Sequence, residues 1–290
     1  MKLFKWIPTS FATWIYTVLF KPKFIRVIIQ KIICLFIPEK IILNDVQLCL
    51  NQKDAIVSGS LALGFYEKSN INLFSKMYQT NSEGKTFLDI GANIGLYSSL
   101  ASKYVGNNGK IISVEPDEVN CSFINKTISI NNFSNIDVYQ VGAGDHDGEA
   151  KLFINDLNKA DHRLYDNTNE RPFKSIKIMK IDTIISSYKD LKVDFVKIDT
   201  QGYEYKVLKG MEQTIKANDN IKITMEFWPW GIVQAGDNPK DLLDLIISYG
   251  FKIKQIDEDK PVIHDIDNVY DLLKLDKERQ HVDLFFEKEK

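Results

Sequence analysis

Cysteine is scarce in this sequence, and no apolar run near its start is long enough to cross a bilayer. The 290 residues include three cysteines, Cys34, Cys49 and Cys121, none of them in a C-x-x-C pair. A disulfide framework or a zinc site is therefore not expected, and a reducing cytoplasm suits the chain best. The apolar run at residues 11–20 is shorter than the roughly 20 residues that a membrane-spanning helix needs. No small-x-small cleavage site of a signal peptide follows it.

Acidic residues are missing from the first 38 positions. Residues 1–40 carry seven basic side chains against the single carboxylate of Glu39, a net charge of +6 in a chain whose total is -2. Trp, Tyr and Phe are mixed with Lys and Arg there, as in helices that lie at an anionic membrane surface. Such helices either contact lipid or pack on the rest of the chain or on a second copy in a homodimer. We predict a basic, hydrophobic helical segment over residues 1–50 and one domain over residues 51–290.

The charge of the chain does not indicate a nucleic-acid partner. The formal net charge is -2, and the region after residue 40 is acidic. Nucleic-acid binding depends on basic side chains that neutralise phosphates. We therefore expect no nucleic-acid substrate.

From about residue 50, short apolar runs alternate with helix-like stretches. This alternation predicts an α/β fold with a mostly parallel sheet and helices on both faces. Seven strands are expected, at residues 86–90, 110–115, 136–141, 195–199, 221–227, 251–256 and 281–287. A polar stretch at about residues 149–178 interrupts the pattern, and two strand-like runs within it predict a β-hairpin with a long loop. Loops of that size in a compact domain are usually functional or disordered.

A glycine-rich turn follows the first predicted strand of the sheet. Residues 89–95 read Asp-Ile-Gly-Ala-Asn-Ile-Gly. Gly91 permits a sharp turn and the close approach of a ligand, while Gly95 lets the next helix pack near the strand. Glu115 comes 20 residues after Gly95, at the end of the second strand. A carboxylate at this spacing can accept hydrogen bonds from both hydroxyls of a ribose.

The turn does not suit a dinucleotide. It lacks the G-x-G-x-x-G pattern, and Asp89 before its first glycine would meet a pyrophosphate as a like charge. The cationic sulfonium and amino group of S-adenosylmethionine (SAM) would instead be attracted to Asp89. We therefore predict SAM as the cofactor. The alternatives are an NAD-dependent sugar oxidoreductase or epimerase, and a non-catalytic membrane-surface scaffold whose turn holds no ligand.

Further carboxylates follow the later strands. Asp199 and Glu204 bracket a glycine turn after the fourth strand, where a carboxylate can bind substrate hydroxyls or take a proton. Glu204 could instead stabilise the start of a helix. Glu226 and Trp228 follow the fifth strand, and a carboxylate beside an aromatic ring suits a sugar. Equally, Trp228 could simply cover the sheet.

The long insertion contains the only histidine near a candidate site. Asp161 and His162 could act as an orienting carboxylate and a base, with Arg163 beside them on the substrate. A solvated turn is the alternative. No metal-ligand spacing is present in the sequence, so no metal is expected.

Together these motifs resemble the FkbM-type methyltransferases. The resemblance is carried by DIGANIGLYS at residues 89–98, VEPD at 114–117, DGEAKL at 147–152 and VDFVKIDTQGYEYKVLKG at 193–210. It covers roughly residues 64–256. It implies a Rossmann-like class I methyltransferase fold, SAM as the donor and most often a hydroxyl as the acceptor. Members of the family act on sugars, polyketide-type natural products and surface glycans.

The resemblance also assigns residues to the site by motif position. It implies that SAM lies along Asp89, Gly91, Asn93, Gly95, Glu115, Pro116, Gly142 and Ala143. Within this set Glu115 would hold the ribose hydroxyls, and the loop that contains Gly142 and Ala143 would border the adenine.

On the acceptor side, the resemblance places Asp199 and Glu204 at the substrate, with Glu67 closing over it. The family's usual glutamate in the fourth motif is Gln201 here, which leaves no carboxylate at that position. We predict an O-methyltransferase that acts on a sugar hydroxyl of a glycan or glycolipid, in the cytoplasm or at the cytoplasmic face of the membrane. A small-molecule natural product is the alternative acceptor.

Overall fold

The computed structural model describes residues 23–288 apart from 156–157, 167, 169, 258–259, 276 and 279. The first half of the basic N-terminal segment, residues 1–22, therefore lies outside the described residues. In the described part of the chain, no helix is both long enough and apolar enough to span a bilayer.

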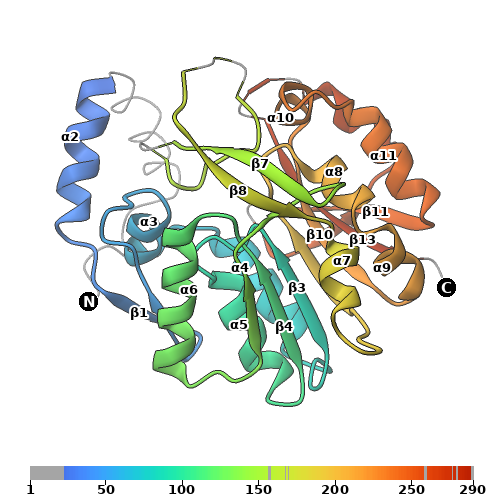
Figure 1. The fold of residues 1–290 in the computed structure, drawn as a ribbon, viewed down its shortest axis with the longest axis horizontal. Coiled ribbons are helices and arrows are strands. Elements are labelled where there is room, and N and C mark those ends of the chain that lie inside the picture. Colours follow the sequence, from blue (N-terminus) through green and yellow to red (C-terminus); the bar gives the residue numbers. More distant parts are fainter. Residues whose placement is uncertain are drawn as a thin grey trace.

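A mostly parallel sheet of eight strands forms the centre of the molecule (Figure 1). Its order is β12-β11-β13-β10-β9-β3-β4-β5. β13 runs antiparallel to both of its neighbours, and β12 runs antiparallel to β11. The strands are β3 (Thr86–Ile90), β4 (Lys110–Val114), β5 (Ile136–Tyr139), β9 (Phe195–Ile198), β10 (Lys222–Phe227), β11 (Phe251–Ile256), β12 (Ile263–Asp265) and β13 (Val282–Lys288). Each predicted run contains a strand, and β12 makes the predicted count of seven one too low.

Helices cover both faces of this sheet, and alternate residues of β3 show the two sides. Phe87 packs into one apolar cluster and Leu88 into the other. Five short helices supply the cluster of Leu88: α7 (Ile181–Ser186), α8 (Glu204–Lys209), α9 (Glu212–Ala217), α10 (Pro229–Gln234) and α11 (Pro239–Ser248). The cluster of Phe87 includes α3 (Val57–Leu63), α4 (Lys68–Tyr78) and α5 (Leu96–Val105). All five residues of β3 are therefore buried, as is typical of a parallel strand between two helical layers.

Local signals explain where the elements begin and end. Helix α6 (Glu118–Asn131) starts at Asp117, whose carboxylate accepts the N–H groups of Val119 and Asn120. Helix α8 ends at Lys209, and α9 begins at Glu212. Gly210 lies between them, and only glycine fits there, because a Cβ would lie 1.9 Å from the carbonyl oxygen of Gly144.

Residues 40–50 are not helical, contrary to the predicted N-terminal segment. After α2 (Lys23–Cys34), the chain forms a hairpin of β1 (Lys40–Leu43) and β2 (Val46–Cys49). Leu48 is 1% exposed and belongs to the apolar cluster of Phe87. The hairpin is held to α6, since the N–H of Cys49 donates to Thr127 Oγ1 at 3.0 Å. The helical part of this segment therefore ends at Cys34, and the hairpin is built into the domain.

The polar insertion forms a small second sheet. Strands β7 (Gly148–Phe153) and β8 (Phe173–Met179) make an antiparallel hairpin where one is predicted, and β6 (Gly142–Ala143) pairs with β8. Figure 1 shows β7 and β8 lying across one end of the central sheet. The long loop between them is thereby carried over the carboxyl ends of the parallel strands.

Candidate functional site

A cavity lies at the carboxyl ends of β3, β4 and β9, beneath the insertion. Its volume is about 1120 Å³ with the space open to solvent included. In open α/β sheets this edge is where ligands bind. Ten predicted site residues line the cavity: Glu67, Gly91, Asn93, Glu115, Pro116, Gly142, Ala143, His162, Asp199 and Glu226.

The turn after β3 holds a backbone shape that favours glycine. Gly91 has φ 80° and Gly95 has φ 82°. A Cβ at Gly91 would also meet the carbonyl oxygen of Asp199 at 1.9 Å. Asn93 has φ 52°, a conformation that Asn tolerates better than most residues. The turn therefore presses closely against the end of β9.

Glu115 locks the turn to the end of β4. Its Oε2 accepts the N–H of Asn93 at 2.8 Å. Its Oε1 accepts the N–H of Asp117 at 3.0 Å and the amide of Asn120 at 3.2 Å. Burial raises the pKa of Glu115 to about 7, even though these donors favour the carboxylate. Its position on the cavity wall fits a partner for the hydroxyls of a ribose.

Asp89 and Gly95 support the cavity without lining it. Asp89 is 1% exposed, and its Oδ2 accepts the hydroxyl of Ser98 at 2.5 Å. Its Oδ1 has no hydrogen-bond partner among the described residues. Gly95 faces α6, where an added Cβ would lie 3.0 Å from Ile124. The structure therefore places both residues behind the wall that a cofactor would touch, because β3 directs Asp89 toward a helix-covered face of the sheet.

Lys197 and Asp199 form an ion pair at the acidic end of the cavity. The distance from Lys197 Nζ to Asp199 Oδ2 is 3.0 Å. Burial opposes the charge on Lys197, but Asp199, Glu67 and Asp89 raise its pKa above the ordinary value. Burial likewise opposes ionisation of Asp199, but Lys197 and a hydrogen bond from Gln201 hold its pKa below the usual range. Asp199 is therefore an ionised carboxylate, with its side chain 28% exposed.

Gln201 joins Asp199 to Glu226. Its amide nitrogen donates to Asp199 Oδ1 at 3.0 Å and to Glu226 Oε2 at 3.1 Å. Burial, followed by repulsion from Asp199 and Glu204, raises the pKa of Glu226 well above its ordinary value. The surroundings therefore shift the pKa of these two carboxyl groups in opposite directions, so that ionisation is favoured at Asp199 and disfavoured at Glu226. Such a pair can accept a proton at one group and donate a hydrogen bond from the other.

Comparison with known proteins identifies the family. A family model described as the methyltransferase FkbM domain matches residues 89–253, more than half of the chain. The chain belongs to the FkbM methyltransferase family. The matched region contains the turn at Gly91, Glu115 and Asp199, so the predicted resemblance is confirmed. The fold is the class I methyltransferase fold, and SAM is the cofactor.

Several solved structures resemble this methyltransferase at low sequence identity. The methyltransferase FkbM from Methylobacillus flagellatus KT matches 92% of this chain at 16% identity with a TM-score of 0.45, and this chain spans 60% of that protein's length. A SAM-dependent O-methyltransferase from Thermotoga maritima has 12% identity and a TM-score of 0.41, over 86% of this chain and 77% of the other. A SAM-dependent methyltransferase from Aquifex aeolicus has 13% identity and a TM-score of 0.40, over 76% and 88%. No curated protein sequence matches the chain.

The cavity of this methyltransferase fits SAM in its chemistry. The open backbone of the turn and Glu115 stand at one part of the wall, and the acidic residues Glu67 and Asp199 stand at another. The first part suits the nucleoside, and the second suits a cationic sulfonium and ammonium. Within the described part of the chain, no group of three or more His, Cys, Asp or Glu side chains could hold a metal ion.

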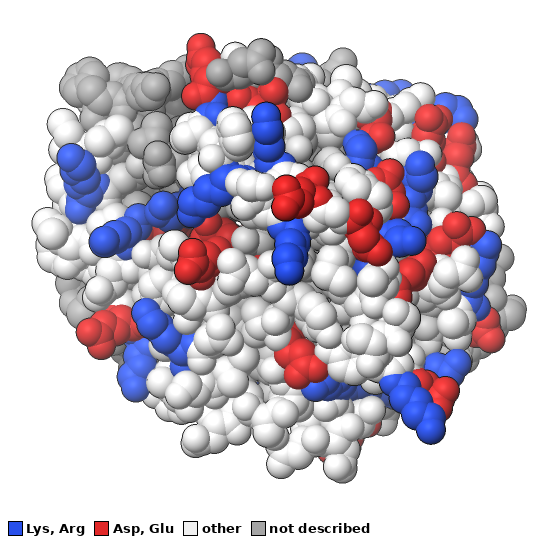
Figure 2. All heavy atoms as spheres, in the orientation of Figure 1, with Lys and Arg blue, Asp and Glu red and all other residues white. Residues whose placement is uncertain are grey.

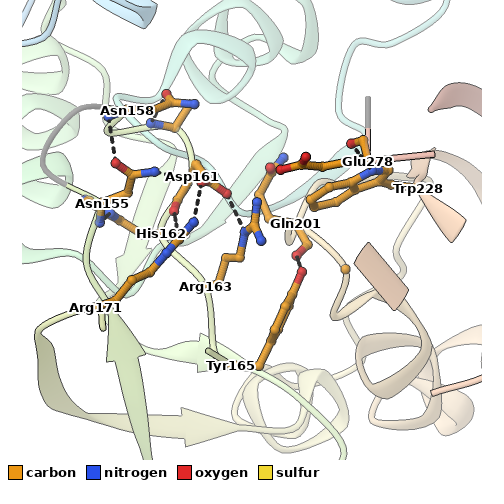
Figure 3. Close-up of polar contacts among 12 residues, drawn as sticks. Asn155, Asn158, Asp161, His162, Arg163, Tyr165, Arg171, Gln201, Trp228 and Glu278 are labelled. Carbon is orange, nitrogen blue, oxygen red and sulfur yellow. Dashed lines mark hydrogen bonds and ion pairs between the residues drawn. The ribbon is translucent and has the colours of Figure 1, made fainter. Parts of the chain in front are cut away.

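Three predicted substrate residues of the methyltransferase anchor the insertion instead of lining the cavity. The Arg163 guanidinium pairs with Asp161 and lies 4.8 Å from the ring centroid of Trp228 (Figure 3). Asp161 also pairs with Arg171 at 2.9 Å. Trp228 is 7% exposed, so the predicted substrate contact is wrong for the described cavity. Instead, the Arg163 side chain ties the loop to the turn after β10.

His162 lines the cavity, but its hydrogen bond argues against a role as the base. Its Nδ1 accepts the N–H of Asn155 at 3.1 Å. Burial lowers the pKa of His162 and keeps the ring neutral. A neutral imidazole that accepts at Nδ1 carries its proton on Nε2, so it donates toward the cavity. Asp161, predicted to orient this ring, is occupied by Arg163 and Arg171 instead.

Glu204 clamps a turn and does not reach the cavity. Its Oε1 accepts the N–H of Thr200 at 2.9 Å, the Thr200 hydroxyl at 3.0 Å and the N–H of Gly202 at 3.2 Å. The side chain is fully buried, and burial raises its pKa to about 7. The helix-terminus interpretation therefore accounts for Glu204, and the predicted catalytic role does not.

Lys197 and Tyr97 are site residues that the sequence did not single out. The Lys197 ammonium lies 4.8 Å from the ring centroid of Tyr97, whose hydroxyl donates to Glu67. Both residues line the cavity. The only sequence signal was the two-residue spacing of Lys197 and Asp199, which puts them on one face of a strand. Nothing in the sequence brings Glu67 to Tyr97.

Proposed function

We propose that this methyltransferase transfers the methyl group of SAM to a hydroxyl of a sugar, in a glycan or glycolipid, with Asp199 receiving the hydroxyl proton. One observation carries the proposal: a partly exposed, ionised Asp199 lines the same cavity as Glu115 and the turn at Gly91. A hydroxyl at Asp199 would therefore stand next to the methyl donor.

The protein's own residues would align the reactants. SAM supplies the activated methyl group when it is bound. Glu115 and the turn would hold the nucleoside, and Asp199 would orient the attacking oxygen by accepting its hydrogen bond. Alignment of this kind contributes much of the rate enhancement in a displacement reaction. Lys197 and Gln201 keep Asp199 in place through one hydrogen bond to each of its oxygens.

The assay is transfer of a labelled methyl group from SAM to a panel of glycans and glycolipids. Asp199→Asn is expected to lower kcat about 100-fold, because the amide cannot take a proton. Its dissociation constant for S-adenosylhomocysteine (SAH) is expected to rise by no more than about tenfold, because Glu67 remains in the cavity lining as an acidic residue for the ammonium. Asp137→Asn is the control, since Asp137 is ion-paired with Lys110 and lies outside the cavity lining. Full activity of Asp199→Asn would exclude Asp199 as the base.

The surface charge supports an acceptor that is not a nucleic acid. Figure 2 shows Lys and Arg side chains interspersed with Asp and Glu over the face in view. Nucleic-acid-binding domains usually present a continuous basic stripe. Methyl transfer to an RNA oligonucleotide, with none to glycans, would contradict this part of the proposal.

We also propose that residues 1–40 contact an anionic membrane surface in the cytoplasm. In the described part of this segment, four apolar side chains are at least half exposed: Ile28, Ile32, Leu35 and Phe36. The absence of acidic residues before Glu39 adds attraction to anionic lipid. Figure 1 shows α2 at the edge of the molecule. The three cysteines are free, as suits a reducing compartment.

Vesicle flotation tests this membrane contact. The protein is expected to float with phosphatidylglycerol vesicles and to remain below with pure phosphatidylcholine vesicles. Leu35→Glu with Phe36→Glu should abolish flotation, whereas Ile42→Glu, an exposed apolar position on β1, should not. A shift of this double variant from dimer to monomer, without any lipid effect, would favour homodimer packing instead.

A further inference from the structure

A second cavity lies between α4 and the sheet. Its volume is about 680 Å³ with its opening to solvent included. Five residues line both this cavity and the SAM cavity: Glu67, Tyr97, Lys197, Asp199 and Glu226. The two cavities therefore meet at these side chains. A ligand in the second cavity would reach Asp199 from the side of β10 and β13.

One wall of the second cavity is apolar. Leu73, Phe74 and Met77 of α4 face it, and Ile256 of β11 completes this wall. Leu73 and Ile256 pack in one small apolar cluster, so the wall is continuous between helix and sheet. An apolar group of a ligand would be stabilised by burial against this wall.

The other wall consists of carboxyl groups. Glu226 and Asp283 are direct cross-strand partners on β10 and β13. Burial is the main cause that raises the pKa of both, which favours their uncharged forms. An uncharged carboxyl group can donate and accept hydrogen bonds, so it suits hydroxyl partners. The only lysine in the lining, Lys197, is already paired with Asp199, and the ring of His281 lies 3.9 Å from Glu226 Oε1, so each basic side chain of the described lining already faces a carboxyl group.

Two residues that line this cavity each have a buried polar atom without a partner among the described residues. The amide nitrogen of Asn70 donates to Asp283 Oδ2 at 2.6 Å, but its side-chain oxygen accepts no hydrogen bond. The hydroxyl of Tyr78, a residue 2% exposed, has no partner either. Buried polar atoms are normally hydrogen-bonded, because an unpaired one is costly. Asn70 and Tyr78 therefore point to a ligand that carries hydrogen-bond donors.

We propose that the second cavity is the acceptor site and that it takes an uncharged polyhydroxy compound with an apolar substituent. This inference rests on the proposed function and names the chemistry of its acceptor. One hydroxyl reaches Asp199, the others face Asn70 and Asp283, and the apolar substituent lies along Met77. In the reaction the S–CH₃ bond of SAM breaks with its electron pair left on sulfur, the acceptor O–CH₃ bond forms, and the hydroxyl proton passes to Asp199.

The test uses hexyl β-D-glucoside below its critical micelle concentration, titrated into the full-length protein saturated with SAH. Met77→Trp fills the cavity and is expected to weaken glucoside binding at least about tenfold. Asn72→Trp places the same side chain on an exposed position of the same helix, outside the lining, and should bind like the wild type. The dissociation constant of SAH should be equal in all three proteins. Hexyl phosphate should bind at least about tenfold more weakly than the glucoside, since the lining carries several carboxyl groups.

A second pair of variants leaves the cavity volume nearly unchanged. Asn70→Leu removes the unpartnered oxygen and should also weaken glucoside binding, with Asn72→Leu as its control. Equal glucoside affinity in Met77→Trp, Asn70→Leu and the wild type would overturn the proposed acceptor site. Binding of hexyl phosphate to the wild type as tightly as the glucoside would overturn it as well. The proposed O-methylation fails on a different result, the absence of methyl transfer to every glycan and glycolipid of the panel, so the two ideas can be refuted separately.

Discussion

Gly91 and Asp199 touch through their backbones where β3 and β9 end. The N–H of Asp199 donates to the carbonyl of Ile90 at 3.0 Å, and a Cβ on Gly91 would lie 1.9 Å from the Asp199 carbonyl oxygen. The turn proposed to border the cofactor and the carboxylate proposed as the base are therefore parts of one rigid contact. A change in the turn should disturb both cofactor binding and the acceptor end.

Gly91→Ala is expected to lower the free energy of unfolding by about 3 kcal/mol, because it adds a backbone clash to an unfavourable φ. SAH affinity should fall at least about tenfold. Gly64→Ala is the matched control: Gly64 has φ 77° but no atom within 4 Å of an added Cβ. Gly64→Ala should lower the free energy of unfolding by only about 1 kcal/mol and leave SAH binding unchanged. Urea unfolding and calorimetric titration measure both effects, and equal losses in the two variants would contradict the contact.

The affinity for SAH should depend on the ionisation of Glu115. Burial raises the pKa of this group to about 7, and ribose hydroxyls prefer to donate to the ionised form. We expect the affinity to decrease about tenfold for each pH unit below 7 and to level off above it. Glu115→Gln should bind SAH weakly with a flat pH profile. A wild-type profile that is flat between pH 5.5 and pH 8 would contradict this role.

Protein stability should decrease with pH through Glu204. Its pKa is raised from 4.5 to about 7. Between these values the folded protein keeps the proton and the unfolded chain does not, so the free energy of unfolding falls as pH rises and the loss is complete above 7. One such group contributes about 3 kcal/mol.

Between pH 4.5 and pH 8, the free energy of unfolding of Glu204→Gln should therefore fall by about 3 kcal/mol less than that of the wild type. Denaturant unfolding at several pH values measures this difference. It should keep the wild-type pH profile of SAH binding, because Glu204 does not line the cavity. Glu115→Gln should flatten the stability profile in the same way and change SAH binding as well. An identical pH dependence of stability in Glu204→Gln and the wild type would refute the burial argument.

Removal of Arg163 should loosen the insertion. Its guanidinium lies between Asp161 and the rings of Trp228 and Trp230, and its side chain is 12% exposed. Arg163→Ala should speed tryptic cleavage within the insertion and weaken SAH binding about tenfold, since the neighbouring His162 and Leu164 line the cavity. Lys151→Ala removes an exposed cation beside Phe173 in the same hairpin and should change neither. Cleavage at the wild-type rate in Arg163→Ala would show that this anchor is not needed.

Local patterns predicted the elements that line the cavity proposed for SAM. The run at residues 86–90 is apolar throughout and forms the fully buried β3. Gly91 and Gly95 both have positive φ, as a sharp strand-to-helix turn requires. Glu115 follows the next strand and lines the cavity with that turn. Such features depend on neighbours in the chain, so the sequence carries them directly.

The anchor residues show where local patterns failed. Asp161, His162 and Arg163 are adjacent and polar, which suggested one catalytic group. In the structure Arg163 turns toward Trp228, which is 65 positions later in the chain, and His162 turns into the cavity. The direction of each side chain depends on the surface against which the loop packs, and the sequence of the loop does not contain that surface.

By itself, the sequence determined the order of strands and helices, the shape of the glycine turn and the SAM-dependent family, because periodicity, positive φ and motif spacing act over short stretches of chain. Only the tertiary structure decided what surrounds Asp199 and what lies behind it. Asn70 and Asp283 are hydrogen-bonded across 213 positions, and their contact shapes the second cavity. Burial and charge pairing among such distant residues set the pKa of Lys197, Asp199 and Glu226, so the chemistry of this end of the site exists only in the folded chain.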